Sequence, residues 1–102
     1  MADSRQESVS TVKWSGDVLA DSALRCKEDL LKAFASSDRV LLDLSACTQI
    51  DVAAIQLIVA SYFEASKTGK RFSVVEPVPA EIGQALELAG LDLRNLESGG
   101  GM

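Results

Sequence analysis

Apolar and polar residues follow one another in blocks whose spacing predicts strands and helices in turn. Val9 to Trp14 alternates loosely and is followed by Ser15-Gly16-Asp17, which is typical of a turn. Val18 and Leu19 then either form a short strand or lead into the next element. A helix is predicted from about Asp21 to Ser36, because apolar residues recur there at helical spacing: Ala23, Cys26, Leu30, Ala33 and Phe34.

The middle of the chain predicts a buried strand that leads into a second helix. Val40 to Leu44 is a compact apolar run, which favours an interior strand covered on both faces. Residues 45–50 are expected to form a small polar turn, and Asp51 stands where a helix N-cap belongs. The helix should run from about Val52 to Thr68 and end at Gly69. Its predicted apolar stripe is Ile55, Ile58, Val59, Tyr62 and Phe63.

The last third predicts one more strand and one more helix. Phe72 to Glu76 is the strand, Pro77 and Pro79 break the chain, and Pro79 suits the first turn of a helix over about Ala80 to Ala89. That helix should turn four residues inward: Ile82, Ala85, Leu86 and Ala89. The alternation of strands and helices predicts an α/β domain whose later strands are parallel, with the strands at 40–44 and 72–76 adjacent.

The length and the net charge of the chain limit the kinds of protein that it can be. The 102 residues are enough for one domain, and a net charge of −5 argues against general nucleic-acid binding. No apolar run approaches the ~18 residues that a membrane span needs, and the first residues lack the apolar core of a signal peptide, so we expect a cytoplasmic protein. We expect a flexible N-terminus at 1–8, one domain at 9–97 and a disordered Gly-rich tail at 98–102.

The residue types present argue against an enzyme. The sequence contains no histidine, which excludes Ser-His-Asp and Cys-His catalysis and His-based metal sites. Cys26 and Cys47 fit no CxxC spacing and are expected to be reduced thiols. A phosphate-cradling glycine loop and a metal-ligand cluster are also lacking. We therefore expect no catalytic residue, no metal and no cofactor; weak nucleotide binding at the start of the second helix is a lesser alternative that only the family resemblance described below implies.

The junction before that second helix carries the chemistry that the sequence does offer. Asp51 is expected mainly to cap the helix, although a helix N-terminus also suits an anion or a partner contact. Asp43 is the only nearby acid and has no identifiable partner base. Ser45 and Thr48 are expected to make local side-chain-to-backbone bonds in the turn.

Several short motifs, in order over roughly residues 9–93, resemble the STAS domain, named after sulfate transporters and anti-sigma factor antagonists. They are Ser15-Gly16-Asp17, Val40 to Ser45, Ile50-Asp51, Thr68-Gly69-Lys70 and Leu88-Ala89-Gly90-Leu91. The resemblance implies an α/β fold with a mixed or parallel sheet of four to five strands and three main helices. It also implies a small regulatory domain that binds a protein partner.

In the anti-sigma antagonist branch, a serine or threonine directly after the junction aspartate is phosphorylated by the partner kinase. Here that position is Val52, followed by Ala53 and Ala54, so no phospho-acceptor is expected; Thr48 is a lesser alternative. Leu19 likewise stands where the family often has an acidic residue. The expected partner-binding residues are Thr48, Asp51, Val52, Ala53 and Gln56.

The resemblance leaves two kinds of protein partner open. The first is an anti-sigma factor or serine kinase, or a chemotaxis or two-component assembly, bound without a phosphorylation switch. The second is the ATPase of an ABC-type lipid transport complex, with this chain as its cytoplasmic STAS subunit. Neither reading involves nucleic acid or membrane insertion, and the oligomeric state stays open.

Overall fold

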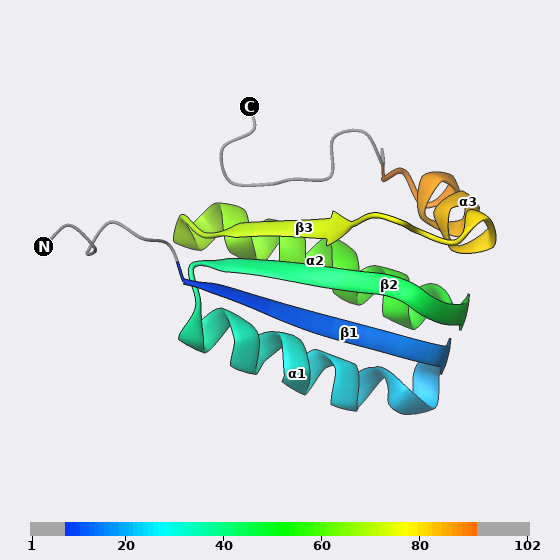
Figure 1. The fold of residues 1–102 in the computed structure, drawn as a ribbon, viewed down its shortest axis with the longest axis horizontal. Coiled ribbons are helices and arrows are strands. Elements are labelled where there is room, and N and C mark those ends of the chain that lie inside the picture. The colour runs from blue at the N-terminus through cyan, green and yellow to red at the C-terminus, as the bar shows by residue number, and fades with distance from the viewer. Residues whose placement is uncertain (1–7, 92–102) are drawn as a thin grey trace, which may run out of the picture.

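The computed structural model describes residues 8–91, so most of the predicted N-terminal segment and the whole Gly-rich tail lie outside the described residues. Strands and helices alternate through this range (Figure 1). In order they are β1 (Val9–Val18), the 3-10 turn η2 (Ala20–Ser22), α1 (Ala23–Ser36), β2 (Arg39–Ile50), α2 (Val52–Thr68), β3 (Arg71–Val75) and α3 (Ala80–Leu88). The predicted α/β class is confirmed.

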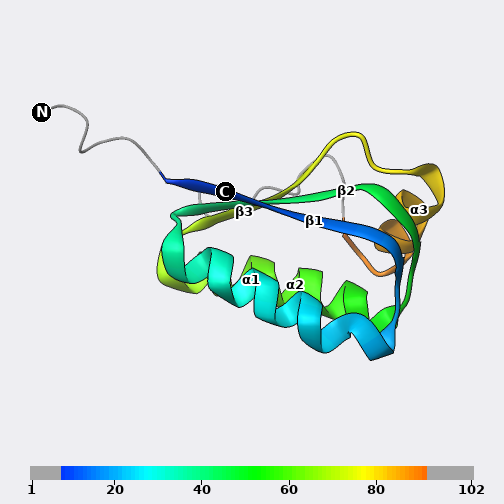
Figure 2. The same ribbon diagram turned by 60° about the horizontal axis from the view of Figure 1, so that its bottom comes forward.

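The described strands form one parallel sheet in the order β1-β2-β3. Both crossovers have the same hand, so α1 and α2 lie side by side on one face of the sheet, while α3 lies near the end where the strands finish (Figure 2). The sheet has three strands within residues 8–91, fewer than the four to five expected. The prediction that the Val40–Leu44 strand is covered on both faces is also wrong for the described residues, because α1 and α2 pack on one face and no helix lies over the other (Figure 2).

β1 and β2 are longer than predicted, and the two expected turns inside them are strand. Gly16 pairs with Cys47 and Val18 pairs with Ile50, so the ladder continues to the last residue of both strands. The pairing changes register twice, between Lys13 and Ser15 and between Gly16 and Asp17, and continues after each shift. These are β-bulges, which polar and glycine residues tolerate well and which local pattern alone does not distinguish from turns.

The core fills the space between the sheet and the two helices. Its fully buried side chains include Leu42 and Leu44 of β2, Ile58 of α2 and Phe72 of β3. The Tyr62 ring meets Phe72 edge-on, with ring centroids 4.8 Å apart. The spacing of buried positions therefore matches the predicted strand and helix periods.

Two residues that we predicted to lie on the buried faces of helices are exposed. Phe63 is 67% exposed, because the sheet-facing side of α2 is instead formed by small residues around Ile58, namely Ala54, Ser61 and Ala65. Phe63 lies five residues after Ile58, which at 3.6 residues per turn places it about 140° around the helix from that buried side chain. Ala89 is exposed because α3 ends at Leu88.

The Lys70 side chain joins three segments at the end of the sheet where the strands begin. Its ammonium donates to the carbonyl oxygens of Phe34 and Ser37, the second at 3.1 Å, and so caps the C-terminal end of α1. A positive charge is favourable there because the last helical carbonyls lack partners within the helix. Lys70 follows Gly69, whose φ of 76° ends α2 in the left-handed conformation that glycine adopts readily.

We predict that Lys70→Met lowers the free energy of unfolding by about 2 kcal/mol, because two carbonyl oxygens lose a charged donor. Urea unfolding followed by circular dichroism measures this change. Lys67→Met is the matched control: Lys67 lies in the last turn of α2 and is exposed, so its loss should change stability by less than about 0.5 kcal/mol. Equal effects of the two substitutions would contradict the capping role.

Candidate functional site

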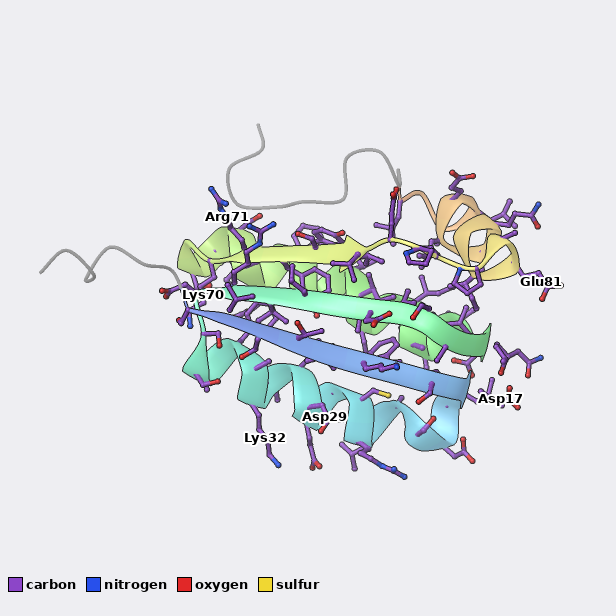
Figure 3. All side chains as sticks on the ribbon, in the orientation of Figure 1. Asp17, Asp29, Lys32, Lys70, Arg71 and Glu81 are labelled. Atoms are coloured by element: carbon purple, nitrogen blue, oxygen red, sulfur yellow. The ribbon has the colours of Figure 1, made fainter. Side chains whose placement is uncertain are left out.

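The residues predicted to bind a partner gather where the parallel strands end, the usual position of binding sites in α/β sheets. Asp17 and Glu81 point from this end of the molecule, whereas Lys70 and Arg71 lie at the opposite end (Figure 3). The end of the sheet where the strands finish therefore carries acidic side chains, and the N-terminus of α2 lies at the same end.

Asp51 is held in place by its backbone and its side chain together. Its carboxylate accepts a hydrogen bond from the Ala54 N–H at 3.2 Å, which confirms the predicted N-cap. Its own N–H donates to the Val18 carbonyl at 3.3 Å, and its carbonyl accepts from the Ile55 N–H at 3.0 Å. The start of α2 is thus tied to the last residue of β1, which makes it a fixed point on the surface.

Thr48 does not make the local backbone bond that we expected. Its hydroxyl donates to the Asp17 carboxylate at 2.8 Å, across to β1. The reason is the second bulge: Gly16 pairs with Cys47 and Asp17 with Gln49, so Thr48 is the extra residue of β2. Ser45 differs from the expectation too, because the local bond there joins its backbone N–H to the Asp43 carboxylate at 2.9 Å and does not involve the Ser45 hydroxyl.

Val52 and Gln56 lie one turn apart on α2 and are both exposed, Val52 by 67%. Ala53, which we also predicted to contact a partner, is only half-buried. We call the set formed by Asp17, Thr48, Asp51, Val52, Ala53 and Gln56 the junction surface. Asp17 is the member that sequence reasoning missed, because only the β1–β2 register places it beside Thr48.

The two cysteine thiols and the Asp43 carboxyl have no feature that would make them unusually reactive. Burial raises the pKa of both the Cys26 and the Cys47 thiols, so neither favours the reactive thiolate. A hydrogen bond from the Ser45 N–H lowers the pKa of the exposed Asp43 carboxyl, which keeps it an ordinary ionised acid. Within residues 8–91, no group of three or more acidic or sulfur side chains is placed to hold a metal ion.

A scan against family models gives a match over residues 1–97, to the model described as "Mlab, STAS domain". The chain belongs to the STAS domain family. The family match extends over nearly the entire sequence, including the junction residues and the helix that follows them. No curated protein matches this STAS chain.

The solved structures that resemble this STAS domain include the following two. The anti-sigma factor antagonist SpoIIAA in its unphosphorylated form superposes with a TM-score of 0.65 at 9% identity, covering 81% of this chain and 76% of that one. The crystal structure of Mglu matches with a TM-score of 0.59 at 19% identity, covering 72% of this chain and 19% of that one. At these identities the matches show a shared fold. In the part of the chain that the structure describes, no helix is long and apolar enough to cross a membrane.

We predict that Asp51→Ala lowers the free energy of unfolding by about 1 kcal/mol, because the Ala54 N–H loses its acceptor. Asp51→Asn is the matched control, since an asparagine oxygen can accept the same bond, and its effect should be a few tenths of that size. Denaturant unfolding of the three proteins measures the difference. If alanine and asparagine destabilised the domain equally, the carboxylate would have a role other than capping.

Proposed function

We propose that this protein is a non-enzymatic regulatory module, like the anti-sigma factor antagonists, that binds a signalling protein through the junction surface without a phosphorylation switch. One observation carries the proposal. Val52, the first residue of α2, is 67% exposed at the position where the family's phospho-acceptor would stand. A valine cannot accept phosphate, but it can add apolar contact area.

The rigidity of the junction supports a docking role. Asp51 is bonded to Val18, Ala54 and Ile55, so the first turn of α2 is already ordered before a partner arrives. A pre-ordered surface loses little conformational freedom on binding, and more of the contact energy then appears as affinity. The buried methyl groups of Val52 would each add up to ~0.8 kcal/mol of that contact energy.

The charges around Val52 indicate the chemistry of the partner surface. Asp51 directly precedes the exposed valine, and Asp17 lies at the same end of the sheet, where its carboxylate accepts a hydrogen bond from the Thr48 hydroxyl. A complementary partner offers an apolar pocket bordered by basic side chains or N–H donors. We propose an anti-sigma factor of the kinase-like ATPase class, or a chemotaxis or two-component protein, acting in the cytoplasm.

We expect Val52→Asp to weaken capture of the partner at least about tenfold, because the substitution places a charged carboxylate in the apolar centre of the interface. The measurement is affinity capture from native lysate with quantitative mass spectrometry, followed by titration of the partner identified. Leu88→Asp is the control: Leu88 is 89% exposed on α3, outside the junction surface, and its substitution should leave capture unchanged. A partner that binds Val52→Asp as tightly as the original protein would show that the junction is not the interface.

A second candidate function is a cytoplasmic STAS subunit of an ABC-type lipid transport complex. The exposed Val52 also favours this function, because a permanent subunit needs a docking surface but no switch. The same capture experiment separates the two candidates. Recovery of an ATPase together with a permease favours the transport complex, whereas recovery of a kinase-like ATPase alone favours the signalling role.

We expect no phosphate on Thr48 after incubation with ATP and a kinase of the anti-sigma class. The Thr48 hydroxyl donates to the Asp17 carboxylate, and a phosphate there would lie against that negative charge. Val52→Ser supplies the missing acceptor and is the positive control, which should gain phosphate at residue 52. Phosphopeptide mapping reads out both proteins, and phosphate on Thr48 of the original sequence would overturn the switch-free proposal.

A further inference from the structure

A groove of about 150 Å³ opens between α1 and α2 on the helical face of the molecule. Leu30 and Phe34 of α1 form one apolar wall, and Leu57 and Ala60 of α2 form the other. The groove lies in the middle of the two helices, and none of the α2 residues of the junction surface lines it. A partner bound at Val52 would not by itself fill this groove.

Leu31 lines the same groove and yet is 54% exposed. It is therefore an apolar side chain of the groove wall that stays largely open to solvent. The surface therefore offers both a knob and a hole, which is the arrangement that a self-complementary contact between two copies needs.

The charged residues of the groove support the same occupant. Lys27 lies near the start of α1 and Glu64 near the end of α2, and the two helices run in the same direction because each returns between parallel strands. The lysine and the glutamate thus belong to opposite walls and to opposite ends of the groove. A two-fold axis through the groove would place Lys27 of each copy against Glu64 of the other.

We propose that a second copy of this chain docks on the groove, so that the protein forms a two-fold symmetric dimer through α1 and α2. Leu31 of each copy enters the groove of the other, and two symmetry-related Lys27–Glu64 pairs set the orientation. The contact pairs one apolar centre with a charged rim, as in other specific protein interfaces. This dimer does not depend on the proposed function of the junction surface.

Analytical ultracentrifugation of the full-length chain over a wide micromolar range tests the dimer. We expect a dimer whose fraction rises with concentration. Leu31→Asp should weaken it at least about a hundredfold, because the two-fold symmetry places one buried carboxylate from each copy in the interface. Leu88→Asp is the matched control, because Leu88 is 89% exposed but lies on α3, away from the groove. It should leave the dimer unchanged, and circular dichroism should show that all variants are folded.

Charge exchange tests the symmetric orientation. Lys27→Glu and Glu64→Lys should each weaken the dimer about tenfold, and the double variant should recover the original affinity within about threefold. A chain that stays monomeric at every concentration overturns the proposal and assigns the groove to a different occupant. Failure of the double variant to recover affinity overturns the two-fold arrangement.

Discussion

The parallel pairing of β1 with β2 is the constraint on which the rest of this structure depends. It begins with Val9 beside Arg39 and ends with Val18 beside Ile50, and two bulges keep the ladder intact through residues that locally resemble turns. Because the ladder reaches Val18, its carbonyl can receive the Asp51 N–H and fix the first turn of α2. The same pairing leaves Thr48 as the extra residue that reaches Asp17. One backbone register therefore shapes the sheet, the helix start and the junction surface.

The charged side chains at the two ends of the sheet have different roles. Where the strands begin, the Lys70 ammonium donates to the carbonyl oxygens of Phe34 and Ser37. Its positive charge therefore stabilises the C-terminal end of α1 within the fold. Where the strands end, Asp17 and Asp51 remain at the surface around an exposed valine. A docking surface at the acidic end fits this division, because its carboxylates stay available to a partner's donors. The groove between α1 and α2 lies in a third region, where we propose a separate contact with a second copy of the chain.

The absence of a hydroxyl at Val52 matters because this residue is the first of α2 and is exposed. Asp51 caps α2, and the helix begins at the next residue. A phosphate at that position would have added about two negative charges beside carboxylates already present. Valine instead leaves an exposed apolar side chain at this position. Under the function that we propose, binding depends on how much partner is present and not on a modification state.

The sequence by itself determined the α/β class, the helix at Val52–Thr68, the Asp51 cap and the Gly69 end, since helical spacing and capping residues act over one or two turns. It also supported the STAS family through motifs in order. Only the tertiary structure decided that residues 45–50 continue β2, that Phe63 faces solvent and that Thr48 meets Asp17. The reason is physical: bulges, helix rotation and cross-strand bonds depend on which segments pack together, and residues 31 apart in sequence become neighbours through the β1–β2 register.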